Sequence, residues 1–156
     1  MNWTLELIVV PVSDIDRAKA FYADRMGFNV DVDFSPNDDF RVVQLTPPGS
    51  AASITLLRNR NAGPDAQMEP GTLRGLHLIV PDIEAARAEL VGRGTDVSDF
   101  FHFGETGQAA GLHPERQNYG TYASIKDPDG NVWLLQEVDR AKEEAHAEAV
   151  PAEAKA

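Results

Sequence analysis

The chain has 156 residues, of which 42% are hydrophobic and 25% charged, values typical of one globular domain. Its net charge of −11 and its pI of about 4.6 argue against nonspecific nucleic-acid binding and against docking to anionic lipid, both of which need a basic surface. The absence of cysteine excludes disulfides and thiolate chemistry, and it suits a reducing cytoplasm.

The sequence shows no membrane or secretion signal. No apolar run approaches the ~20 residues that a membrane helix needs. The opening residues, MNWTLELIVV, lack the basic segment and the small-residue cleavage site of a signal peptide. We therefore expect a cytoplasmic protein whose partners are neither membranes nor nucleic acids.

The first half of the chain has the pattern of a strand, a helix and three more strands. The apolar run 5–12 predicts the first strand, and a helix over 15–26 follows, with Ser13 or Asp14 as its N-cap. Gly27 then provides a C-cap. Three strand-like segments come next, at residues 29–34, 40–45 and 52–57.

The second half repeats this order. Residues 12–18, VSDIDRA, match residues 80–86, VPDIEAA, at an offset of 68, from 80 − 12. The repeat predicts a strand over 76–80 and a helix over 83–93 that Asp82 caps. Three further strands are predicted, at residues 96–103, 121–125 and 132–138, the last of them preceded by the turn 127–131.

Three segments lie between or beyond these modules. Residues 58–72 link the two halves. Residues 103–120 form a long loop with several glycines, which is either a binding loop or a flexible excursion. Residues 139–156 are rich in Ala and Glu, and we expect a tail that is helical up to Pro151 and otherwise mobile. The domain is thus predicted at residues 1–138, with modules at about 1–60 and 73–138.

Two sets of local motifs accompany the repeat. One is Val10–Asp14 followed by Phe21-Tyr22 and Met26-Gly27-Phe28, and the other is Asp127–Asn131 leading into Trp133–Glu137. Over residues 5–138, the motifs and the repeat resemble the vicinal oxygen chelate superfamily of glyoxalases, bleomycin-resistance proteins and extradiol dioxygenases. The resemblance implies an α+β fold in which two tandem βαβββ modules form a half-barrel cavity, and it implies a homodimer.

The resemblance also implies where a divalent metal would be held, on the first and last strands of each module. The matching positions are Leu7 with Ser53 or Thr55 in the first module, and Gly75 with Leu134 in the second. None of these residues offers the imidazole or carboxylate that divalent metals prefer. We therefore expect no metal and no other cofactor, with a metal site displaced along the strands as the alternative.

Strand alternation indicates which side chains face the cavity. It directs a few polar groups inward among apolar neighbours, namely Gln44, Ser53, Thr55, His77 and Gln136. A cavity of that composition suits a small, largely apolar organic ligand held by a few hydrogen bonds.

For each of four residues the sequence leaves two roles open. His77 is the candidate catalyst, because histidine can act as acid or base near neutral pH, or it is a structural hydrogen-bonded residue. His102 lies in the aromatic run 100–103, which either stacks on a planar ligand or packs as core. Arg116 either clamps a carboxylate or phosphate or pairs with a neighbouring acid. Tyr122 is a binding residue or a structural one.

Three functions, in decreasing order of preference, follow from these patterns. The missing metal ligands favour a protein that binds a small organic molecule, similar to the superfamily's drug-sequestering resistance proteins. The alternative is a metal-independent isomerase or lyase that uses His77 as acid and base. A glyoxalase-type metalloenzyme with displaced ligands is the third and least favoured interpretation.

Overall fold

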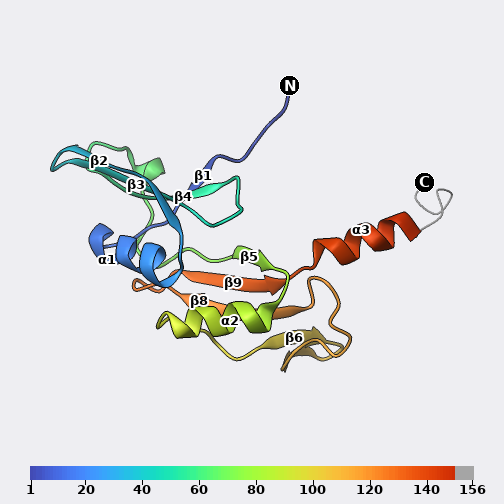
Figure 1. Ribbon diagram of the computed structural model, residues 1–156. Coiled ribbons are helices and arrows are strands. Elements are labelled where there is room, and N and C mark those ends of the chain that lie inside the picture. The colour runs from blue at the N-terminus through green and yellow to red at the C-terminus, as the bar shows by residue number, and fades with distance from the viewer. Residues whose placement is uncertain (150–156) are drawn as a thin grey trace.

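The computed structural model describes residues 1–149, and the rest of the predicted tail lies outside the described residues. The first module contains β1 (Leu7–Val9), α1 (Ile15–Ala20), a π-helical turn η1 (Phe21–Arg25), β2 (Asn29–Asn37), β3 (Phe40–Thr46) and β4 (Ser53–Asn59). Its strands form one sheet in the order β1-β4-β3-β2, in which β1 runs parallel to β4 (Figure 1). A short turn, η2 (Pro64–Ala66), lies in the linker that follows.

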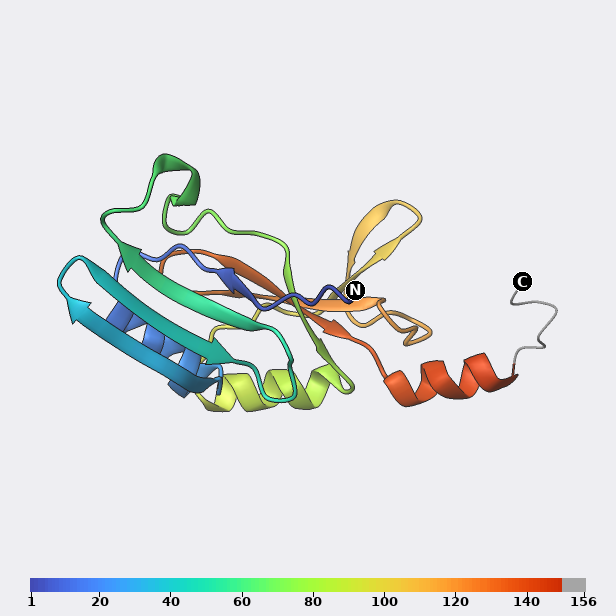
Figure 2. The same ribbon diagram turned by 90° about the horizontal axis from the view of Figure 1, so that it is seen from above.

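The second module repeats this plan with one more strand. It contains β5 (Leu76–Val80), α2 (Ile83–Gly92), β6 (Phe101–Gly104), β7 (Gly107–Ala110), β8 (Thr121–Lys126) and β9 (Val132–Glu137). The sheet order is β5-β9-β8-β6-β7, with β5 parallel to β9. The helix α3 (Arg140–Ala149) extends away from both sheets (Figures 1 and 2). In the described part of the chain, every helix is too short or too polar to cross a membrane.

The two modules confirm the predicted α+β class and its tandem strand-helix-strands order. The prediction of one continuous loop over 103–120 is wrong, because β7 pairs antiparallel with β6 inside it. The sequence of β7, Gly-Gln-Ala-Ala, contains no β-branched or aromatic residue, so cross-strand pairing rather than local propensity makes it a strand. The strand predicted over 96–103 begins only at Phe101, and the helix predicted over 15–26 becomes π-helical at Phe21.

Both helices begin where the repeat places their caps. The carboxylate of Asp14 accepts a hydrogen bond from the backbone N–H of Arg17 at 3.0 Å, and the carboxylate of Asp82 accepts one from Ala85 at 3.0 Å. Each carboxylate thereby satisfies an N–H group that has no partner within the helix.

We predict that Asp82→Ala lowers the free energy of unfolding by about 1 kcal/mol, because the first turn of α2 loses its side-chain acceptor. Thermal unfolding followed by circular dichroism measures the change. The matched variant Asp82→Asn keeps a capping oxygen and should stay within about 0.5 kcal/mol of the parent protein. Equal losses in both variants would contradict the capping role.

The two modules share one hydrophobic core. Each helix covers one face of its own sheet (Figures 1 and 2), and buried aromatic rings from both modules pack together in the core. The ring of Tyr22 lies 5.8 Å from those of Phe28 and Trp133. Its hydroxyl donates to Asp127 at 2.8 Å and accepts from the Trp133 indole N–H at 2.9 Å. Burial raises the pKa of Tyr22 well above its ordinary value, and the Asp127 carboxylate raises it further.

A polar network at the turn 127–131 joins the two modules. The fully buried Asn131 donates through Nδ2 to the Pro11 carbonyl at 2.8 Å and to the Asp127 carboxylate at 2.7 Å. Its Oδ1 accepts from the backbone N–H of Leu73 at 3.0 Å. One side chain therefore connects the first module at Pro11 with the start of the second module at Leu73 and with the turn 127–131.

Two arginines at equivalent positions cross the boundary between the modules. Arg25 and Arg93 are separated by the repeat offset, 93 − 25 = 68. The guanidinium of Arg25 donates to the carbonyl of Gly94 at the end of α2. The guanidinium of Arg93 lies against Gly27, which follows the first helix and has a φ of 74°. Glycine is needed here for two reasons: any side chain would clash with Arg93, and the positive φ is unfavourable for other residues.

Candidate functional site

Each sheet has one face that turns away from the helices, called its open face below. On the first sheet, the open face includes Gln44 and Thr55, which are direct partners on β3 and β4, and Ser53 at the start of β4. The Ser53 hydroxyl is 2.7 Å from that of Thr46. The Thr55 hydroxyl is buried without a hydrogen-bond partner among the described residues. These three predicted site residues thus share one face, as strand alternation indicated.

On the open face of the second sheet, Gln136 is hydrogen-bonded to three neighbouring residues, among them His77. The amide of Gln136 donates through Nε2 to the Tyr119 carbonyl at 3.1 Å and to the Tyr122 hydroxyl at 3.0 Å. The carbonyl partner fixes the orientation of the amide, so its Oε1 faces Nδ1 of His77 at 2.9 Å. His77 must therefore carry a proton on Nδ1, which leaves Nε2 as the free nitrogen of an exposed side chain.

Beside these residues lies an aromatic platform, defined here as Phe101, Phe103 and Tyr122. The rings of Phe101 and Tyr122 stack with centroids 5.6 Å apart and planes at 15°. Phe103 meets Tyr122 edge-on at 5.6 Å and is 57% exposed. His77 lies at 6.3 Å from Tyr122 in an edge-on arrangement. Together these residues present flat apolar surface next to polar atoms that can orient a ligand.

The sequence did not assign Phe101 and Phe103 to the site. Alternation placed them on one face of the run 100–103 and His102 on the other, without deciding which face was open. The pairing of Phe101 with Tyr122 decides it, because directly opposed residues share a face. Of the three platform residues, only Tyr122 was a candidate from the sequence.

Two predicted site residues lie away from this face. His102 points to the opposite side of β6, where its Nδ1 donates to the Gly111 carbonyl at 2.9 Å. Its ring lies 5.9 Å from that of His113. Arg116 uses its guanidinium in ion pairs with Glu137 at 2.7 Å and Glu84 at 3.1 Å. These partners raise the pKa of Arg116 above its ordinary value and engage the donors that a ligand would need.

The positions at which the resemblance places a metal do not fit one. Leu7 is the direct partner of Ser53, and Leu134 is the direct partner of His77, while Gly75 precedes β5. Each strand pair thus offers at most one nitrogen or hydroxyl ligand, where a divalent metal needs several. In the part of the chain that the structure describes, no three His, Asp or Glu side chains converge on a common point.

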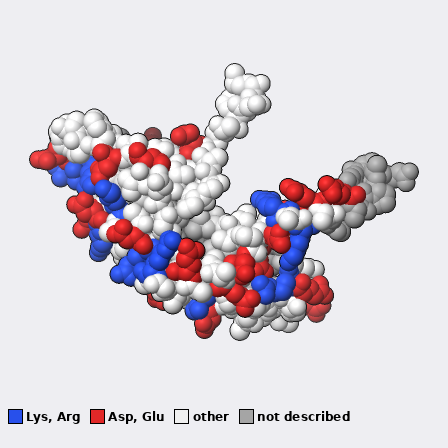
Figure 3. All heavy atoms as spheres, in the orientation of Figure 1, with Lys and Arg blue, Asp and Glu red and all other residues white. Residues whose placement is uncertain are grey.

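The chain is acidic overall, with 25 Asp and Glu against 14 Lys and Arg, but the two signs are interspersed on the surface (Figure 3). On the described residues of the face shown in Figure 3, acidic and basic side chains alternate over the helices, and the basic ones form no extended area. The aromatic platform, His77 and Gln136 include no carboxylate and no guanidinium group. The site therefore suits a ligand that is recognised by shape and stacking more than by charge.

Comparison with known proteins gives a consistent result. Residues 4–135 match the family model described as Glyoxalase/Bleomycin resistance protein/Dioxygenase superfamily. The chain is similar to TnmS3, described as an antibiotic binding protein from Streptomyces sp. CB03234, with 34% identity, a TM-score of 0.65, and coverage of 87% of this chain and 96% of that one. A glyoxalase/bleomycin resistance protein from the same organism is 34% identical, with a TM-score of 0.62 and coverage of 85% and 99%. An uncharacterized protein of Shewanella frigidimarina is 29% identical over 146 residues, which are 90% of this chain and 98% of that protein.

Proposed function

The chain belongs to the glyoxalase/bleomycin resistance protein/dioxygenase superfamily, and from this premise we propose that it binds a small, largely apolar organic ligand on the open face of its second sheet. The observation that carries the proposal is the aromatic platform. Its Phe103 is 57% exposed, and its Tyr122 accepts a hydrogen bond from Gln136. The description of TnmS3 as an antibiotic binding protein supports a ligand of this kind. A flat ring would stack on the platform while a polar substituent reaches Nε2 of His77.

We further propose that the binding site is completed in a homodimer. The open faces leave large apolar side chains in water, among them Phe34 at 54% and Val32 at 41% on the first sheet, and Ile79 at 43% on the second. Opposing the open face of one chain to that of a second copy would bury these groups and enclose the ligand. Sedimentation velocity tests the proposal, and a monomer at micromolar concentration would contradict it.

The prediction for the site concerns Phe103. Titration with the fluorescent apolar probe N-phenylnaphthylamine should give saturable binding, and Phe103→Ala should weaken it about 3- to 10-fold, since one aromatic contact contributes ~0.5–1.5 kcal/mol. His102→Ala is the matched control, because its side chain is on the other face of the same strand, and it should leave the affinity unchanged. Equal loss in both variants, or no saturable binding by the parent protein, would exclude this face as the site.

A catalytic role for His77 is the second candidate function. Its Nδ1–H is held by Gln136, which leaves Nε2 available on the open face as a base or, once protonated, as an acid. The step would be proton transfer on a bound ligand, as in an isomerase or lyase without a metal. Once a ligand is known, mass spectrometry of the incubated ligand separates the two functions. Product that forms with the parent protein and not with His77→Ala supports catalysis, and unchanged ligand supports binding alone.

A further inference from the structure

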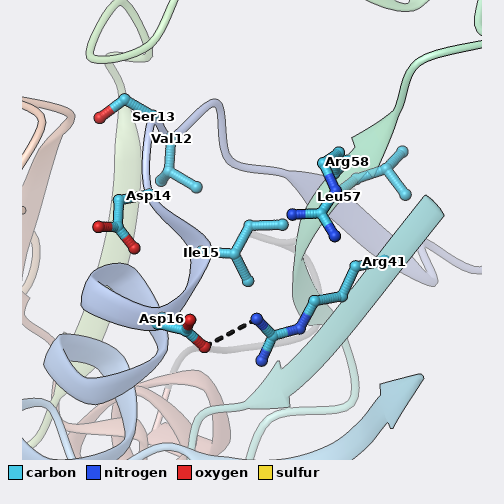
Figure 4. Close-up of a pocket in the computed structure, with 8 residues that line it drawn as sticks. All are labelled: Val12, Ser13, Asp14, Ile15, Asp16, Arg41, Leu57 and Arg58. Atoms are coloured by element: carbon cyan, nitrogen blue, oxygen red, sulfur yellow. Dashed lines mark hydrogen bonds and ion pairs between the residues drawn. The ribbon is translucent and has the colours of Figure 1, made fainter. Parts of the chain in front are cut away.

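A hollow lies on the helix side of the first sheet, between the start of α1, the start of β3 and the end of β4 (Figure 4). Its volume is about 360 Å³, at the small end of the range for small-molecule sites. Arg41 and Arg58 line it and are direct partners on the two antiparallel strands. Both belong to the helix side of the sheet, since they alternate with open-face residues such as Leu57. The hollow is therefore separate from the proposed ligand face.

The two arginines differ in how their charges are balanced. Arg41 donates to Asp16 at 2.7 Å and, through Nε and Nη2, to both carboxylate oxygens of Asp33 at 3.1 Å. Arg41 and Lys19 lower the pKa of Asp33 to about 2. Arg58 has no ion pair among the described residues, and its Nε is buried without a hydrogen-bond partner. Of the two opposed arginines, Arg58 is thus the one without a carboxylate partner among the described residues, and its buried Nε–H lacks an acceptor there.

The acids that face Arg58 are already engaged. The carboxylate of Asp14 caps α1, and that of Asp16 pairs with Arg41. Figure 4 shows the Arg58 guanidinium directed into the hollow, toward Ile15 and Arg41. A guanidinium presents several N–H groups in a planar fork that matches the spacing of carboxylate or phosphate oxygens.

We propose that this hollow binds a small oxyanion, a carboxylate or a phosphate, through the guanidinium of Arg58. The anion pairs with the arginine of the hollow that has no carboxylate partner among the described residues and gives its buried Nε–H an acceptor. This site is independent of the ligand face and of the proposed function, because it lies on the helix side of the first sheet, whereas the ligand face belongs to the second sheet, and the two share no residues.

The test is a titration with inorganic phosphate and, separately, with acetate, at constant ionic strength set by chloride. Nuclear magnetic resonance of the parent protein should show a saturable shift of the Arg58 Nε–H signal with at least one anion. At tenfold excess over the dissociation constant, Tm should rise by about 4 °C. A response to phosphate alone or to acetate alone identifies which oxyanion is bound, and either supports the proposal. An Arg58 signal that neither anion moves would overturn it.

The variant Arg58→Met should lose the saturable rise in Tm. Its matched control is Arg60→Met, two residues along the chain, where the arginine side chain is 62% exposed and pairs with Asp39. That control should respond like the parent protein. A rise that survives Arg58→Met would place the anion elsewhere and overturn the proposal. If Arg58→Met does not fold, the titration of the parent protein's Arg58 signal decides alone.

Discussion

Asn131→Ala is expected to lower the free energy of unfolding by about 3 kcal/mol, because three hydrogen bonds of one buried side chain are lost together. The Pro11 carbonyl and the Leu73 N–H lose their side-chain partner inside the buried turn. Urea denaturation followed by tryptophan fluorescence and by circular dichroism measures the loss. The two curves should coincide, since the side chain holds both modules at once.

The control for this prediction is Asn61→Ala. Asn61 is exposed in the linker, and its substitution should change the free energy of unfolding by no more than about 0.5 kcal/mol. A loss below about 1 kcal/mol for Asn131→Ala would show that the network at turn 127–131 contributes little to joining the modules.

Arg116→Ala should have the second largest effect on stability, about 2 kcal/mol at neutral pH. It leaves the Glu137 carboxylate, whose side chain is only 8% exposed, without its bidentate partner. Breaking a fully buried pair costs ~3–5 kcal/mol, and the lower figure applies because Arg116 is 37% exposed to water. The Ile83 N–H remains as a donor to the carboxylate. Arg60→Ala, which breaks an exposed pair, should cost less than about 1 kcal/mol.

This ion pair also predicts a pH dependence. Arg116 holds the pKa of Glu137 below its ordinary value of 4.5, and the Ile83 N–H lowers it as well. Because the pKa of the folded state lies below that of the unfolded state, the contribution to stability is complete above about pH 4.5 and is lost as the pH falls through the folded-state pKa. Stability should therefore fall less steeply on acidification in Arg116→Ala than in the parent protein. Parallel profiles of the two proteins would refute the assignment.

Most of the fold was predictable because its signals are local and occur twice. The repeat at offset 68 located both helices, and Asp14 and Asp82 cap them where the repeat predicts. Alternation within β3, β4 and β9 correctly divided core from open face. The strand β7 was missed since nothing in its composition favours a strand, and only its partner β6 specifies it.

The site was less predictable because it depends on which strands become neighbours. Alternation assigned Gln136 and His77 to the same side, and the structure joins them at 2.9 Å. It could not orient the run 100–103, since that needs the register of β6 against β8. For Arg116 an ion pair was one of the two roles offered, but its partners could not be named, because Glu84 and Glu137 lie 32 and 21 residues away. The network around Asn131 was visible in sequence only as a turn motif.

The reciprocal contacts of Arg25 and Arg93 bear on how such a chain arises. Each arginine reaches the end of the other module's helix, so the seam between the halves has approximate two-fold symmetry. A seam of that kind is self-complementary, as in a dimer of identical subunits. A half-length ancestor that paired with itself would already have possessed it. Duplication and fusion of its gene would then have required only a linker, after which the two open faces were free to diverge.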